Sequence, residues 1–123
     1  MNEYGKFINI NKEYEKYYHI YFNDNKEEMK RKYINEDDKV RKIKIIIDSE
    51  IKSFYDLFCD SKCIETINFK KFFRENITNM ASMFYGCSSL KQLNLNNFNI
   101  NNATNMSNMF SGCLSLNCKG TES

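Results

Sequence analysis

Apolar residues recur with a period of about 26 residues through the second half of the chain. The stretch 83–95 reads MFYGCSSLKQLNL, and related stretches stand one period earlier, at 57–69, and one period later, at 109–116. A constant period without insertions is typical of stacked copies of one structural unit. The pattern therefore predicts a repeat protein in which each unit buries its apolar side chains against the next.

Each unit contains two apolar groups with different spacings. The first group has the spacing L-x-x-L-x-L, whose last two apolar positions alternate with outward residues as in a strand. The second group is spaced by three, three and one residues, which favours a short helical or 3-10 return leg. The first group comprises Val40, Ile43 and Ile45, then Ile64, Ile67 and Phe69, then Leu90, Leu93 and Leu95; the second comprises Ile51, Phe54, Leu57 and Phe58, then Ile77, Met80, Met83 and Phe84, then Ala103, Met106, Met109 and Phe110.

These groups predict an α/β repeat fold, a short solenoid of parallel strands and short return legs. We expect the repeats to occupy residues 34–117, with an N-terminal capping segment at 1–33 and a tail at 118–123. The first unit departs from the pattern because it is two residues shorter than the others. Within the capping segment, the apolar clusters at 7–10 and 17–22 favour a strand pair, and the charged run 26–32 favours one or two helical turns.

The last unit is incomplete. Leu116 begins a further L-x-x-L-x-L, but Lys119 and Thr121 occupy its next apolar places. An open end of this kind predicts mobility or weak self-association through the last turn.

Composition narrows the classes of partner. The net charge is +2, from 18 basic and 16 acidic residues, so no strong field attracts nucleic acid or an anionic membrane. Lys39, Arg41, Lys42 and Lys44 do cluster near tyrosines that could stack on bases, but acidic residues 36–38 precede them. A solvated strand edge is the favoured interpretation, and no nucleic-acid partner is expected.

The chain as written starts with a polar stretch and contains no long apolar run. Residues 1–10 carry Glu3 and Lys6 and lack the apolar core of a signal peptide, and the aliphatic run 45–47 is far too short to span a bilayer. If Met1 is the true start, these features favour the cytoplasm, with the cell surface as the alternative. No membrane span is expected.

One run of sequence carries a family resemblance. The stretch GCSSLKQLNLNNFNINNATNMSNMFSGCLSL, at 86–116, resembles the BspA-like leucine-rich repeat family (the DUF285 type), with units C-x-x-L-x-x-L-x-L and T-x-M-x-x-M-F-x-x-C. The matching positions are Cys87, Leu90, Leu93, Leu95, Phe98, Thr104, Met106, Met109, Phe110 and Cys113. The resemblance implies a strand-and-turn solenoid and, as function, protein recognition. Its members in bacterial surface proteins imply the alternative of a fragment of a cell-surface adhesin.

Five cysteines raise the question of metal or disulfide chemistry. Cys59, Cys63 and Cys87 with His19 could form a zinc site, but paired C-x-x-C spacings are missing, so no metal is predicted. Cys87 and Cys113 stand one period apart, about 4.8 Å along a stack, and parallel side chains favour two buried free thiols.

Catalytic signals are weak. The single histidine, His19, lies in a tyrosine-rich stretch, and a packed or surface ring is the favoured interpretation. Acidic residues 36–38 could bind a cation, but a solvated loop explains them equally. Gly86 and Gly112 are repeat-position turn glycines and no glycine-rich phosphate loop is present. We therefore expect a protein that is not an enzyme and has no cofactor.

Asn76, Asn102 and Asn105 each begin an N-x-S/T triplet. Glycosylation would require a secreted protein. The period favours the alternative, short polar side chains that bond to the backbone at the corner of each unit.

The predicted binding site is the outward face of the parallel strands, because such faces are the usual partner surface of solenoids. We expect an unidentified protein ligand there, and a plain solvated sheet is the alternative. The face comprises Lys42 and Lys44, then Thr66, Asn68 and Lys70, then Gln92, Asn94 and Asn96.

Overall fold

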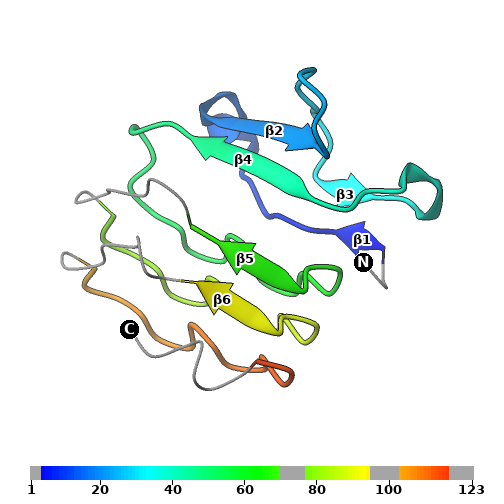
Figure 1. Cartoon of the computed structure of the whole chain (residues 1–123). Coiled ribbons are helices and arrows are strands. Elements are labelled where there is room, and N and C mark those ends of the chain that lie inside the picture. Colours follow the sequence, from blue (N-terminus) through cyan, green and yellow to red (C-terminus); the bar gives the residue numbers. More distant parts are fainter. Residues whose placement is uncertain (1–3, 70–76, 95–102, 117–123) are drawn as a thin grey trace.

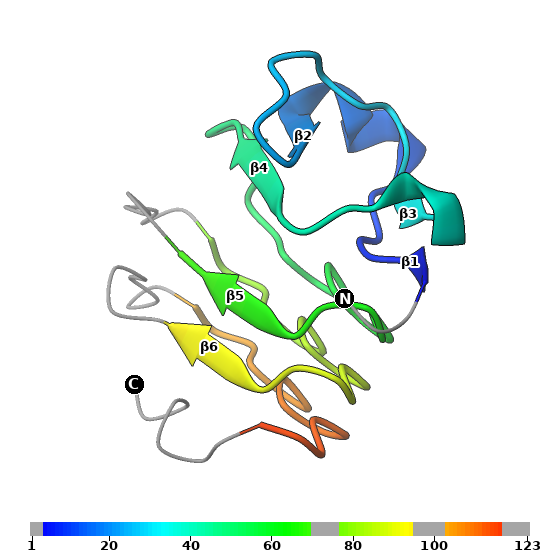
Figure 2. The same cartoon turned by 45° about the vertical axis from the view of Figure 1, so that its right-hand side comes forward.

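The computed structural model describes residues 4–69, 77–94 and 103–116 (Figure 1). Within these ranges, six strands form three two-stranded sheets. Two of the sheets come from residues 5–47 and lie over one end of the molecule, and the third belongs to the repeated units (Figures 1 and 2). No helix of the described segments has the length and apolar character that crossing a membrane requires.

The N-terminal part consists of two antiparallel strand pairs and two short 3-10 helices. In the first pair Gly5 lies opposite Ile34, and in the second Ile20 lies opposite Ile45. Side chains of β2 alternate between buried and partly exposed, so this strand presents one apolar face to the core. The elements in chain order are β1 (Gly5–Lys6), η1 (Lys12–Tyr17), β2 (Tyr18–Phe22), β3 (Tyr33–Ile34), η2 (Glu36–Asp38) and β4 (Ile43–Ile47).

Two local predictions for this part were wrong. β2 pairs with β4 and not with residues 7–10, where Phe7 and Ile8 are both buried and therefore do not alternate as strand residues do. The charged run 26–32 forms no helix, because Met29 bridges to Ile20 in an extended arrangement. The boundary expected at 33/34 stays a prediction, and the β2–β4 pair joins residues on either side of it.

The repeated units meet through parallel backbone pairing. β5 (Thr66–Asn68) pairs in parallel with β6 (Gln92–Asn94), and each residue of β5 lies opposite its equivalent one period later. Two isolated parallel bridges on the return side keep the same offset, Ser53 with Asn79 and Asn79 with Asn105. Leu93, in the middle of β6, is 3% exposed, so its side chain lies on the core side of the strand.

The return legs of the units are successive hydrogen-bonded turns, where the sequence predicted a helix or 3-10 segment. In the first unit the N–H of Leu57 donates to Phe54, and the N–H of Cys59 donates to Asp56. Left-handed backbone at every fourth residue ends each turn, which prevents a helix from continuing. The left-handed positions are Asp56, Ser82 and Asn108 (φ 56–58°), and Asp60, Gly86 and Gly112 (φ 59–80°).

Aromatic side chains at equivalent positions stack along the units. The rings of Phe58 and Phe84 lie 5.8 Å apart and nearly parallel, and those of Phe84 and Phe110 lie 5.7 Å apart. Phe84 and Met83 are fully buried between the units on either side. Burial of this size contributes about 1.5–3 kcal/mol for each large apolar side chain, which couples each unit to its neighbours.

β4 differs from the parallel strand predicted for the first unit. Its described hydrogen-bonded partner is β2, although it lies beside β5 in both views (Figures 1 and 2). The spacing from Ile43 to Ile67 is two positions shorter than that from Ile67 to Leu93, which changes the register at this point. Ile43, Ile45 and Ile47 are partly buried while Lys44 and Ile46 are exposed, as the sequence alternation predicted.

Candidate interaction surface

Four predicted site residues form one polar face on β5 and β6. Thr66 lies opposite Gln92, and Asn68 lies opposite Asn94. All four side chains are exposed, while Ile67 and Leu93 between them face the core. Period-two alternation in the strands therefore places hydroxyl and amide groups in adjacent pairs on a rigid base. We call these four residues the strand face.

The predicted lysines lie away from the strand face, Lys44 on β4 and Lys42 directly before it. Lys44 is exposed on β4, and its Nζ lies 4.9 Å from the ring centroid of Tyr21 on β2. Lys42 Nζ lies 2.6 Å from Asp24 Oδ1. The structure therefore gives both cations partners of their own near β2 and does not align them with the strand face. Lys70 and Asn96 lie outside the described residues.

The chemistry of the strand face is neutral and rich in hydrogen-bonding groups. Amide side chains both donate and accept hydrogen bonds, so they can match the N–H and C=O groups of a polypeptide backbone. The neighbouring charges, Lys91 Nζ and Glu65 Oε1, lie 3.7 Å apart and offset one another. The surface suits a polypeptide ligand better than a highly charged one.

Polar side chains hold the corner of each return leg. Asn79 Oδ1 accepts a hydrogen bond from the N–H of Ala81 at 3.0 Å, and Asn105 Oδ1 accepts one from Ser107 at 3.1 Å. Ser53 Oγ has the same role toward Tyr55 at 3.2 Å. The corner role predicted from the Asn triplets therefore holds for Asn105, whereas Asn76 and Asn102 lie outside the described residues.

His19 links β2 to two carboxylates. Its Nδ1 lies 3.2 Å from Glu28 Oε1 and its Nε2 lies 3.4 Å from Asp48 Oδ2. The hydrogen bond to Glu28, and then that to Asp48, raise the pKa of His19 above its ordinary value. Both ring nitrogens are engaged, so the arrangement is an ion-pair bridge. Asp38, another carboxylate considered from sequence, accepts two hydrogen bonds from Arg31, which lower its pKa.

Two cysteines donate hydrogen bonds to the preceding unit. Cys87 Sγ lies 2.9 Å from the carbonyl oxygen of Phe58, and Cys113 Sγ lies 3.0 Å from that of Phe84. Burial raises the pKa of Cys87 to about 12 and also raises the pKa of Cys113. The predicted burial is confirmed for Cys87, whereas Cys113 is only partly buried. In the part of the chain described here, no three His, Cys, Asp or Glu residues are grouped as metal ligands.

A hollow lies beside β2 and the N-terminal 3-10 helix η1. It has a volume of about 430 Å³ and an apolar floor that includes Ile20 and Met29. Charges of both signs surround it, and across its rim Lys32 Nζ contacts Glu15 Oε1 at 2.5 Å. Lys30 and Glu28 make a second ion pair at the rim, and the charges of both signs give the hollow no distinct preference for a cation or an anion.

Asn9 covers the first return leg, a role that the sequence did not reveal. Its backbone N–H donates to the carbonyl of Leu57 at 2.7 Å. Its side-chain Nδ2 donates to the carbonyls of Asp56 at 2.8 Å and Cys59 at 3.0 Å. Asn9 thus stands where a preceding unit would place its donors. The only feature of the sequence that could have indicated this role is that Asn9 lies between two apolar residues, Ile8 and Ile10.

Comparisons with known proteins place the chain in a family. A family profile described as "Mycoplasma protein of unknown function, DUF285" matches residues 27–122. No curated protein and no solved structure matches the chain. The match covers the units and their hydrogen-bonded corners as well as β3 and β4.

Proposed function

This chain belongs to the DUF285 family, and we propose that it is a non-enzymatic protein-interaction module built as a short leucine-rich-repeat solenoid of the BspA-like type. Its ligand is a protein segment that binds on the strand face. No residue acts as a catalyst in this proposal, because the charged clusters of the described structure pair internally. The hydrogen-bonded His19 bridge and the Arg31–Asp38 pair are examples.

The observation that carries the proposal is the register of the strand face. Thr66 with Gln92 and Asn68 with Asn94 make two adjacent polar pairs over a buried apolar layer. A rigid, preorganised surface reduces the entropy lost on binding. The face has no large aromatic anchor, so we expect modest affinity from these units alone.

The proposal is tested by capture of a protein ligand with the immobilised chain. Candidates are proteins retained from a lysate of the source organism and identified by mass spectrometry. The test variant replaces Asn68, Gln92 and Asn94 together by Ala, and a separate Lys44→Ala variant asks whether β4 contributes. The proposal expects a retained protein whose binding falls by about tenfold or more in the triple variant.

A matched control separates surface recognition from general adhesion. Asn11, Asn25 and Lys26 are exposed polar residues of the N-terminal part, and their joint replacement by Ala should leave binding unchanged. Equal retention by the wild type and the strand-face variant, with both folded, would show that the assigned face is wrong.

A further inference from the structure

In the turns of the return legs, the backbone hydrogen bonds between successive units run in one direction. Only at the start of each leg do they run the other way, from Thr78 to Lys52 and from Thr104 to Thr78. From the first unit, the N–H groups of four alternate residues donate to carbonyl oxygens of the second unit at 2.6–3.1 Å. The second unit donates to the third in the same way at 2.8–3.1 Å. The first set of donors is Phe54, Asp56, Phe58 and Asp60, with acceptors Asn79, Ala81, Met83 and Tyr85; the second set is Met80, Ser82, Phe84 and Gly86, with acceptors Asn105, Ser107, Met109 and Ser111.

The third unit repeats the donor positions at Met106, Asn108, Phe110 and Gly112. Within the described residues these four N–H groups, which we call the amide row, have no acceptor. The carbonyl oxygens of Met106, Asn108 and Phe110 instead accept bonds inside their own turns, from Met109, Ser111 and Cys113. The four turn positions of this edge therefore offer donors. The single equivalent acceptor is the carbonyl of Thr104, at the start of the leg, where Lys52 and Thr78 accept from the following unit.

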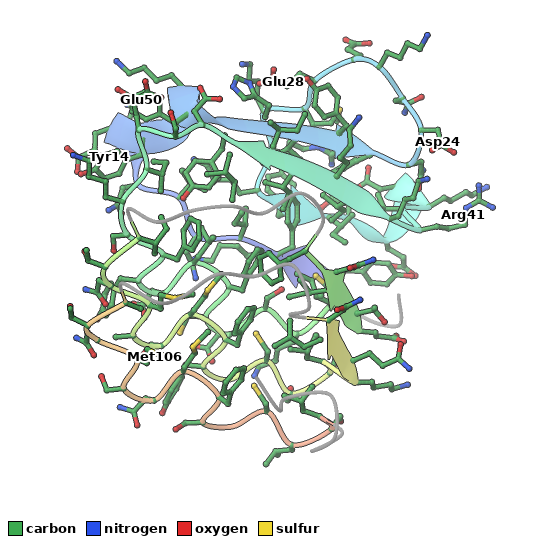
Figure 3. All side chains as sticks on the ribbon, turned by 60° about the vertical axis from the view of Figure 1, so that its left-hand side comes forward. Tyr14, Asp24, Glu28, Arg41, Glu50 and Met106 are labelled. Carbon is green, nitrogen blue, oxygen red and sulfur yellow. The ribbon has the colours of Figure 1, made fainter. Side chains whose placement is uncertain are left out.

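An apolar surface accompanies the amide row. Met106 is 40% exposed, although the equivalent Met80 is 0% exposed and Phe54 is 1% exposed. Figure 3 shows Met106 on the outermost described turn, at the end of the molecule opposite the N-terminal sheets. At the two existing junctions, the turn segment of the next unit pairs with the four N–H groups and buries the residue equivalent to Met106.

We propose that the amide row is a docking site for a turn segment of another polypeptide chain, of the same repeat type, that presents carbonyl oxygens from alternate residues. Backbone donors on the row and backbone acceptors on the partner form the contact, and Met106 is buried beneath it. This mode extends a stack by main-chain pairing, as in the addition of a strand to a sheet edge. The site is separate from the strand face and does not depend on it.

A second copy of the chain offers only part of the required acceptors. The equivalent carbonyls of its first unit are those of residues 53, 55, 57 and 59, and Asn9 already donates to those of Leu57 and Cys59. Phe7 and Ile8, which directly precede Asn9, are at most 1% exposed, so displacing this segment would expose large apolar side chains. If the amide rows of two copies faced each other, N–H donors would meet N–H donors and no hydrogen bonds would form between them. The polarity of the edge thus favours a different chain over the self-association expected from sequence.

A synthetic peptide tests the site directly. The probe is the blocked peptide of residues 77–90, ITNMASMFYGCSSL, with Cys87→Ser, because this segment fills the equivalent place on the first unit. The readout is amide hydrogen exchange of the full chain, measured by NMR with and without the peptide. We expect saturable binding that slows exchange at Met106, Asn108, Phe110 and Gly112, while Met109, Ser111 and Cys113, bonded already, change little.

Variants and a scrambled peptide complete the test. Met106→Glu should weaken peptide binding by about tenfold or more, since a carboxylate must then be desolvated. Ile46→Glu is the matched control, because Ile46 is 47% exposed on β4 and should be replaceable without effect. The proposal would be overturned by absence of peptide binding, by binding without the alternating protection, or by equal binding of the scrambled peptide. It would also be overturned if self-association alone protected the amide row of the wild-type chain.

Discussion

The hydrogen bonds of Cys87 show how a residue can be fixed by the unit before it. Its thiol is 1% exposed, donates to Phe58, and has a pKa of about 12. The equivalent residue of the first unit, Ser61, is buried as well. Small side chains thus occupy this position, and in the second and third units they donate to the carbonyl of the preceding unit.

Cys87 should resist thiol reagents until the chain unfolds. The thiolate is the reactive form, and both the raised pKa and the burial suppress it. Site-resolved mass spectrometry after maleimide labelling at neutral pH should find Cys59, which is partly exposed, labelled at least about tenfold faster than Cys87. Labelling of the two thiols at equal rates without denaturant would show that the unit junction opens readily.

His19 predicts a defined pH dependence of stability. Glu28 first, and then Asp48, raise the pKa of its imidazole in the folded chain. A raised pKa means that the protonated ring stabilises the fold. This contribution is fully present below the unfolded value of about 6.5 and is lost as the pH rises through the higher folded value.

The comparison is between wild type and His19→Gln in thermal unfolding across this range. The wild type should have the higher melting temperature in mildly acidic buffer, and the difference should shrink toward mildly alkaline buffer. A difference that stays constant with pH, or grows on the alkaline side, would contradict the ion-pair bridge.

Among the elements, the return legs show what the sequence could and could not predict. The period placed Phe58, Phe84 and Phe110 in one stack, and the structure confirms their ring contacts. The spacing of three, three and one suggested a helix. Successive turns with hydrogen bonds between residues three apart give the same spacing, because they also place every third side chain on one side. The left-handed residues that end the turns include Asp56 and Ser82. Because they are not glycines, the sequence did not indicate their backbone conformation.

Strand neighbours were less predictable than strand faces. Alternation correctly gave the exposed side of β4 and of the strand face, because side-chain direction follows from local geometry. Alternation does not say which strand lies alongside, and Ile43–Ile47 can pair with β2 or with a parallel neighbour equally well. Lys44 therefore lies in a different sheet from Asn68 and Asn94, and Lys42 lies directly before that sheet's strand β4.

The hydrogen bonds of Asn9 to the first return leg end the stack on the N-terminal side. Asn9→Ala removes two side-chain hydrogen bonds and leaves two carbonyls without these donors. At about 0.5–1.5 kcal/mol each, the variant should lose about 1–3 kcal/mol of unfolding free energy.

Urea unfolding measures this loss, and Asn11→Ala is the control because Asn11 is exposed and its side chain makes no capping bond. The control should change stability by less than about 0.5 kcal/mol. Equal effects of the two substitutions would remove Asn9 from its capping role.

At the scale of the whole molecule, the two ends of the stack differ in chemistry. The N-terminal end is covered by two antiparallel sheets and by donors from Asn9, and the opposite end presents the amide row beside Met106 (Figure 3). The difference follows from the direction of the turn hydrogen bonds, because four alternate residues of each return leg donate to the next unit and only the bond at the start of the leg runs the other way. Both proposed binding surfaces depend on the same parallel arrangement of units.

Solution NMR of the full chain tests that arrangement most directly. The parallel stack predicts nuclear Overhauser contacts between residues one period apart on both sides of the units, between Thr66 and Gln92 on the strands and between Phe58, Phe84 and Phe110 in the core. Contacts at a different offset, or an absence of contacts between Phe58 and Phe84 in a folded chain, would contradict the account.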